Sequence, residues 1–114
     1  MKVYLDDVRS VGWTTHGTEW ADWVVVRTMG NFIKLVKYAK PEMVSLDYDL
    51  SESDPEHTGL DAVNYILEML ENDPTLIGPS VYIHSAHSMA DEMNKVAQKI
   101  YALQHQRKVS SEEQ

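Results

Sequence analysis

The segment 43-MVSLDYD-49 decides the fold, because in it a short apolar run ends in two aspartates. The first residues repeat this arrangement, since Val3-Tyr4-Leu5 runs into Asp6-Asp7. A third run, Val81-Tyr82-Ile83, ends in His84-Ser85. Short runs of β-branched and aromatic residues, bounded by turn-forming residues, are typical of buried strands. The sequence therefore predicts three strands, each followed directly by polar side chains.

Helical patterns separate these strands along the chain. The run Trp23-Val24-Val25-Val26 predicts one further strand, and apolar residues spaced three and four apart predict helices that begin at Thr28, near Gly59 and after Ser88. Alternating strands and helices are typical of an α/β domain with a parallel sheet. We expect a three-layer sandwich around a short, mainly parallel four-stranded sheet, with a long loop over residues 10–22.

The composition narrows the class of protein. The chain has 114 residues, of which 43% are hydrophobic, no cysteine and a formal net charge of −8. That size suits one domain, which we place at residues 1–107, followed by a flexible tail at 108–114. The negative charge disfavours duplex nucleic acid as a partner, and no stretch of about 20 apolar residues predicts a membrane span. We expect a cytoplasmic protein in which any metal ligands are Asp, Glu or His.

The acids after the first and third apolar runs form a candidate metal site. The carboxyl ends of parallel strands meet in one crevice, so Asp6, Asp7 and Asp47 are expected to lie close together. Like charges at short range repel, and carboxylate oxygens are suitable ligands for Mg²⁺ or Mn²⁺. Without a metal, the same crowding would favour one protonated carboxyl that serves as a general acid. Each aspartate alone could equally cap a turn or a helix.

Other residues at the same edge are candidates for catalysis and phosphate binding. His84 directly follows a strand, which suits a general acid or base that faces the crevice; a buried, hydrogen-bonded histidine is the alternative. Asp49 is a candidate to orient a water molecule or a partner group. The candidate phosphate ligands are Arg9, Ser85 and the helix start at Thr58-Gly59. A surface ion pair for Arg9 and a plain loop-to-helix junction at Thr58-Gly59 remain the alternatives.

Part of this pattern resembles the receiver domains of two-component response regulators. The resemblance rests on Leu5-Asp6-Asp7, on Asp47 after the third strand and on a hydroxyl residue after the fourth. Those domains bind Mg²⁺ with the paired acids and accept a phosphoryl group on the third-strand aspartate. The resemblance implies a flavodoxin- or receiver-like fold. The chain departs from them in two respects, because it lacks the helix between the first two strands and lacks a recognisable fifth strand with its lysine.

The chain resembles the family of cyclic-phosphate-processing receiver domains more closely, over nearly its whole length. The residues that carry this resemblance are Lys2-Val-Tyr-Leu-Asp-Asp-Val-Arg9, Val26-Arg27-Thr28, Ser45-Leu-Asp-Tyr-Asp-Leu50, Thr58-Gly59 and His84-Ser85-Ala86. The resemblance implies hydrolysis of cyclic phosphates at RNA ends or on nucleotides, in bacteria or their viruses. It also implies a polar site made of Asp6, Asp7, Arg9, Asp47, Asp49, His84 and Ser85.

Two functional hypotheses follow. The first is a metal-assisted phosphoesterase for a small cyclic phosphate, in which Asp6, Asp7 and Asp47 hold Mg²⁺ or Mn²⁺ and in which His84, Asp47 and Asp49 take part in catalysis. The second is a non-catalytic, receiver-like module that binds a nucleotide signal or a protein, including a second copy of the chain through an edge strand or a helix face. A phosphorylated signalling switch is the least favoured hypothesis, because its lysine is missing.

Overall fold

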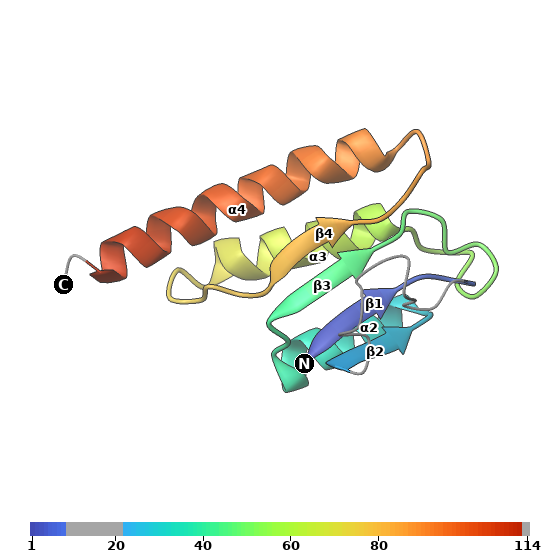
Figure 1. Cartoon of the computed structure of the whole chain (residues 1–114), viewed down its shortest axis with the longest axis horizontal. Helices are drawn as coiled ribbons and strands as arrows, with labels where there is room; N and C mark the ends of the chain where they lie inside the picture. The colour runs from blue at the N-terminus through green and yellow to red at the C-terminus, as the bar shows by residue number, and fades with distance from the viewer. Residues whose placement is uncertain (9–21, 113–114) are drawn as a thin grey trace.

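The computed structural model describes residues 1–8 and 22–112 (Figure 1). Its strands are β1 (Lys2–Leu5), β2 (Trp23–Val26), β3 (Met43–Leu46) and β4 (Ser80–Ile83). Its helical elements are α2 (Met29–Lys34), the π-helical turn η2 (Leu35–Ala39) that continues it, α3 (Gly59–Asn72) and α4 (Ala90–Glu112). The predicted loop at residues 10–22 lies outside the described residues except for Asp22.

The four strands form one parallel sheet in the order β2-β1-β3-β4. Leu5 pairs with Val26 on one side and with Leu46 on the other, and Leu46 pairs with Ile83. All four strands therefore end level with one another, and the residues that follow them stand along one edge of the sheet. The predicted α/β, receiver-like fold with a four-stranded parallel sheet is confirmed.

The hydrophobic core lies between one face of this sheet and the helices. Side chains alternate along a strand, so Val3 and Leu5 of β1 share a face with Val44 and Leu46 of β3. These residues form one buried cluster with side chains of α2, α3 and α4. Tyr4 and Ser45 point to the opposite face. In Figure 1, α2 and α3 lie behind the strands, and α4 runs beside β4.

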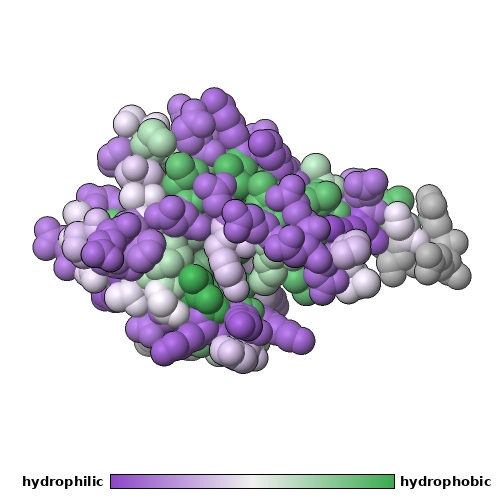
Figure 2. Space-filling view, turned by 180° about the vertical axis from the view of Figure 1, so that it is seen from behind, coloured by the Kyte–Doolittle hydropathy of each residue, from purple (hydrophilic) through white to green (hydrophobic). Residues whose placement is uncertain are grey.

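The outer surface of the helical layer matches the acidic, polar composition. Seen from behind, it is mostly hydrophilic, and hydrophobic residues appear only in limited patches (Figure 2). Among the described residues, no helix combines the length and the apolar character needed to cross a membrane.

Helix α4 continues through Glu112, so residues 108–112, which were predicted to belong to a flexible tail, are helical. The hydrophobic pattern fades after Leu103, but polar side chains anchor the helix instead. Gln104 is 7% exposed, and its Nε2 donates to the carbonyl oxygens of Ile77 and Pro79. Arg107 donates to the carbonyl oxygens of Leu70, Asp73 and Leu76. Hydrogen bonds to the end of α3 and to the α3–β4 loop thus replace apolar packing.

Replacing Arg107 by alanine is expected to lower the free energy of unfolding by about 1–3 kcal/mol, because three carbonyl oxygens at the end of α3 lose a charged donor. Urea unfolding measures the change. Lys108→Ala, an exposed neighbour on the same helix, is the control and is expected to stay within about 0.5 kcal/mol of the wild type. Equal stabilities for the two variants would contradict the anchoring role of Arg107.

Candidate functional site

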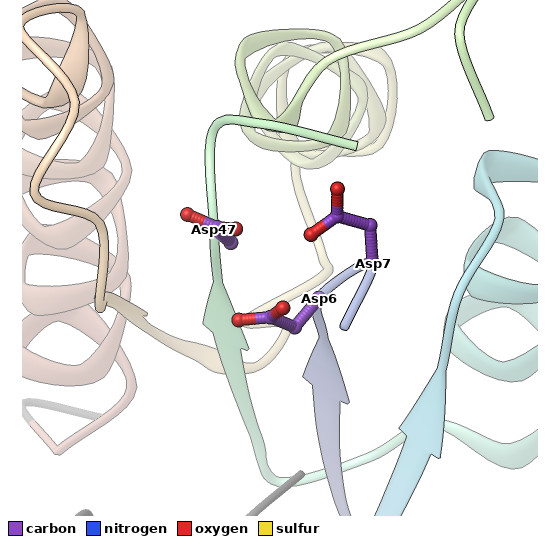
Figure 3. A group of neighbouring side chains, drawn as sticks. All are labelled: Asp6, Asp7 and Asp47. Carbon is purple, nitrogen blue, oxygen red and sulfur yellow. The ribbon is translucent and has the colours of Figure 1, made fainter. Parts of the chain in front are cut away.

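Three carboxylates converge at the carboxyl ends of the two central strands (Figure 3). Asp6 and Asp7 follow β1, and Asp47 follows β3. One oxygen of each side chain lies within 4.8 Å of the others. Asp6 is 0% exposed and Asp47 is 5% exposed, whereas Asp7 is half-buried. The structure thus brings together the three residues that the sequence suggested as metal ligands.

The parallel register produces this convergence. Asp6 N donates to Val26 O at 3.2 Å, and Asp47 N donates to Leu5 O at 3.0 Å, so the ladder of hydrogen bonds extends one residue past the strands. The chain leaves β1 toward β2 on one side and reaches β3 on the other, which makes the gap between β1 and β3 the point where the strand order reverses. Ligands of open α/β sheets bind in the crevice at such a point.

Hydrogen-bond donors from the protein partly compensate the negative charge of this group. Asp6 accepts from Val8 N at 3.0 Å and lies 3.0 Å from His84 Nε2, and Asp7 accepts from Glu52 N at 3.2 Å. The Arg27 guanidinium donates to the backbone oxygen of Asp6 at 3.1 Å. These contacts fix the direction of the carboxylates. The atoms that could bind a metal ion here are carboxylate oxygens, which are the ligands that Mg²⁺ and Mn²⁺ prefer.

His84 lies at the end of β4, as predicted, but its ring faces the neighbouring strands. Nε2 is 3.0 Å from Asp6 Oδ2, Nδ1 is 2.7 Å from Ser45 Oγ, and the ring stacks on Tyr4 with centroids 4.2 Å apart. The side chain is only 10% exposed. Residue 84 continues the alternation of Ser80 and Tyr82, which places it on the face that carries Tyr4 and Ser45. The imidazole therefore contacts the Asp6 carboxylate from the face of the sheet opposite to the helices.

A pocket of about 460 Å³ opens in front of the carboxylates. Asp7, Asp47 and Asp49 line one part of it, and the loop between β4 and α4 lines another with Ser85, Ala86 and His87. His84 is not among the described residues that line this pocket. Of the residues that the sequence suggested, the structure thus brings Asp7, Asp47, Asp49 and Ser85 around one space, and Asp6 is buried beside Asp7 and Asp47.

Asp49 is an exposed carboxylate on the rim of this pocket. The backbone amide of Ser51 donates to its Oδ1 at 2.9 Å. This hydrogen bond is the main cause that lowers the pKa of Asp49 below its usual value of 3.8, and the nearby His87 ring contributes a smaller effect. Asp49 is consequently ionised at neutral pH, which suits it to accept a hydrogen bond from a water molecule or a ligand.

The other predicted phosphate ligands take no part in the pocket as described. Thr58 N donates to Asp61 Oδ2 at 2.9 Å, and Gly59 N donates to Tyr48 O at 2.8 Å, so both amides serve the start of α3. A Cβ atom on Gly59 would stand 1.8 Å from Asp47 O, so glycine is needed for close backbone packing. Arg9 lies outside the described residues, and its predicted phosphate contact stays a prediction.

The sequence reasoning did not select Arg27 and Ser45 as part of the site, and it gave His87 little weight. For Arg27 and Ser45 a signal existed, because Ser45 lies on a strand and Arg27 directly follows one, each close to residues that were predicted to belong to the site. Arg27 follows Val26, the partner of Leu5, so it stands beside Asp6. Ser45 lies two residues before Asp47, on the face opposite to the helices. His87 carried no such signal, since it stands in a loop whose course the sequence does not predict.

The loop after β3 lines one side of the pocket and is tied to the start of α2. Asp54 accepts from Met29 N at 2.8 Å and lies 2.9 Å from His57 Nδ1. The Ser53 hydroxyl donates to Arg27 O, and Glu52 N donates to Asp7. The loop thus links α2 and the end of β2 to one of the three clustered carboxylates.

The contact between Asp54 and His57 predicts a titration shift. The hydrogen bond that the His57 ring donates to Asp54 is the main cause that raises the pKa of His57 above 6.5, and the charges of Asp54, Asp61 and Glu56 add to it. The ion pair therefore stabilises the fold below the unfolded pKa, and this contribution is lost as the pH rises through the raised pKa. NMR titration of the His57 ring is expected to show a raised midpoint that Asp54→Asn moves back toward 6.5. An ordinary midpoint in the wild type would contradict this contact.

Comparison with known proteins gives one match. The family model of the cyclic-phosphate processing Receiver domain matches residues 1–99, which include every described residue of the pocket. No curated protein and no solved structure matches the chain. The match ends within α4, before the Gln104 and Arg107 contacts that anchor its last turns.

Proposed function

The chain belongs to the family of cyclic-phosphate processing receiver domains, and from this premise we propose that it hydrolyses a cyclic phosphate ester on a small nucleotide or at an RNA end, assisted by a divalent metal. The observation that carries the proposal is the convergence of Asp6, Asp7 and Asp47, whose oxygens lie within 4.8 Å of one another beside an open pocket. Three carboxylates at this distance repel one another unless a cation neutralises them. A phosphate needs the same neutralisation before it can approach an acidic pocket.

The three aspartates fit a hard divalent cation. Mg²⁺ in proteins takes one or two carboxylates and keeps sites for water and phosphate oxygens, and Mn²⁺ accepts the same donors. Asp6, Asp7 and Asp47 would hold the ion. When bound, such an ion polarises a phosphate and makes a coordinated water more acidic.

The remaining groups of the pocket would position the reactants. Hydrolysis adds the oxygen of water to phosphorus, breaks one P–O bond of the ring, and transfers a water proton to the leaving oxygen, so that a phosphate monoester forms. Asp49, ionised on the rim, accepts a hydrogen bond from the attacking water, and the Ser85 hydroxyl donates to a phosphate oxygen. His84 contacts Asp6 and Ser45, which supports a positioning role rather than the direct proton transfer that the sequence suggested.

A panel of cyclic phosphates tests the proposal. Nucleoside 2′,3′-cyclic and 3′,5′-cyclic phosphates and an oligoribonucleotide with a cyclic end are incubated with the protein and Mg²⁺ or Mn²⁺, and products are separated by chromatography. We expect a monoester from at least one substrate, a loss of turnover of about 100-fold or more in Asp49→Asn, and unchanged turnover in Glu68→Gln, an exposed site on α3. Failure of the wild type to convert any member would overturn the enzymatic proposal.

The second candidate is a module that binds a cyclic nucleotide without converting it. The near-burial of His84 favours it, because the imidazole that the sequence suggested for proton transfer is 10% exposed and lies against Ser45 and Asp6. Isothermal titration with the same panel separates the candidates, since binding with no product supports the module. A dimer through the β4 edge remains a separate prediction, tested by light scattering.

A further inference from the structure

The loop between β4 and α4 places two hydrogen-bonding side chains on the pocket wall formed by residues 85–87. Ser85 and His87 both line the pocket, and the other polar residues of the lining include the carboxylates of Asp7, Asp47, Asp49 and Glu52. An anionic ligand held among these acids needs donors on the wall that it touches. The Ser85–His87 loop is the part of the described lining that offers a hydroxyl and an imidazole.

Backbone amides of the same loop occupy the acceptor atoms of both side chains. His87 N donates to Ser85 Oγ at 3.1 Å, and Met89 N donates to His87 Nδ1 at 3.0 Å. Because Nδ1 accepts, the neutral ring carries its proton on Nε2. The Ser85 hydroxyl hydrogen and the His87 Nε2–H group then remain as the donors of these two side chains.

Tyr48 fixes the plane of the His87 ring. The two rings stack with centroids 4.3 Å apart and an interplanar angle of 29°. Among the described residues, the group with metal-ligand spacing consists of Asp6, Asp7 and Asp47, and His87 does not belong to it. The ring therefore lies on the pocket wall outside this carboxylate group, and the backbone sets its tautomer.

We propose that His87 binds a non-bridging phosphate oxygen through Nε2–H, beside the Ser85 hydroxyl. Nε2 is the nitrogen that offers the donor, because Nδ1 accepts from Met89 N. The inference rests on the proposed function, because it assigns the phosphate side of the same site.

His87→Asn isolates the donor. An asparagine oxygen readily accepts from the amide two residues further on, which preserves the contact to Met89 N, but the side chain no longer reaches the pocket with a donor. His105→Asn, the same change on the far part of α4, is the matched control. Isothermal titration measures the affinity for Mg²⁺ alone and for inorganic phosphate in the presence of Mg²⁺.

We expect His87→Asn to bind Mg²⁺ as the wild type does and to bind phosphate roughly 10- to 100-fold more weakly, which is the cost of one hydrogen bond to a charged group. His105→Asn should match the wild type in both titrations. Unchanged phosphate affinity in His87→Asn overturns this inference and leaves the proposed function standing. Absence of both Mg²⁺ and phosphate binding in the wild type overturns the two together.

A second readout does not depend on the variant. In the wild type, a long-range ¹H–¹⁵N spectrum should show the His87 ring as the Nε2–H tautomer, and phosphate with Mg²⁺ should shift its Nε2 resonance more than its Nδ1 resonance. An Nδ1–H tautomer with Nε2 as the acceptor in the phosphate complex would contradict the donor role of Nε2.

Discussion

Replacing Asp7 by asparagine is expected to stabilise the metal-free protein and to remove at least half of its stabilisation by Mg²⁺. In the wild type, carboxylate oxygens of Asp6, Asp7 and Asp47 lie within 4.8 Å of one another, where two unit charges repel by roughly 3 kcal/mol at an effective dielectric constant near 20. Solvent and the bond from Glu52 N reduce this cost, and the asparagine oxygen can keep that bond. We expect a net gain of about 1 kcal/mol without metal.

In the presence of Mg²⁺, the substitution is expected to reduce the stability that the folded protein gains from the metal. A ligand present at 100 times its Kd stabilises the folded state by about 2.7 kcal/mol, which is roughly 10 °C in Tm for a domain of this size. Asp7→Asn removes a charged ligand, and the affinity should fall by at least the roughly 10- to 100-fold that loss of a supporting contact costs at metal sites. The variant should thus keep at most about half of the wild-type rise in Tm between EDTA and Mg²⁺.

Thermal melts of the wild type and the variant, each with Mg²⁺ and with EDTA, measure both effects. Glu68→Gln removes one negative charge from an exposed position on α3 and controls for the net charge of the chain. It should keep the wild-type response to Mg²⁺. A full Mg²⁺ response in Asp7→Asn would show that any bound metal uses other residues.

Gly59→Ala is expected to destabilise the protein by about 3 kcal/mol or more. A Cβ atom at this position would stand 1.8 Å from Asp47 O, 2.7 Å from Asp47 C and 2.8 Å from Met93 Cε. The first two are backbone atoms, so α3 would have to move away from the end of β3, and the usual cost of forcing an extra carbon into a packed site is about 1–3 kcal/mol. Since Asp47 belongs to the carboxylate group, the Mg²⁺ response should weaken as well.

Gly30→Ala is the matched control for this substitution. Gly30 is exposed in α2, and an added Cβ would meet nothing within 4 Å. Alanine favours a helix interior over glycine, so a gain of about 0.5–1 kcal/mol is expected. Chemical unfolding of the two variants gives both values. A stable Gly59→Ala protein with an unchanged response to Mg²⁺ would contradict the close packing of α3 on Asp47.

The carboxylate group could be predicted from the sequence because it depends only on strand ends. Once β1 and β3 are recognised and taken as parallel, Asp6, Asp7 and Asp47 must share an edge. Gly59 was also selected, as a residue that lets a phosphate approach closely. In the structure its lack of a side chain serves the approach of α3 to Asp47 O. A required glycine indicates a close contact, but the sequence does not show which group makes that contact.

The direction of His84 could not be predicted, because it depends on which face of the sheet the helices cover. The side chain of residue 84 points to the same face of the sheet as Tyr82. The helices pack against the other face, which carries Val81 and Ile83. The imidazole therefore contacts Tyr4, Ser45 and Asp6.

The last turns of α4 could not be predicted for a different reason. They are anchored by the polar side chains of Gln104 and Arg107, and a pattern of hydrophobic residues does not reveal such contacts.

The most direct test of the central claim is ³¹P NMR of a nucleoside 2′,3′-cyclic phosphate mixed with the protein and Mg²⁺. We predict that the signal of the cyclic ester disappears and that of a phosphate monoester appears with the wild type, and that Asp47→Asn leaves the cyclic ester intact. Asp47 both lines the pocket and belongs to the carboxylate group, so the comparison tests the metal site and the hydrolysis at once. Conversion at the wild-type rate by Asp47→Asn would contradict the account.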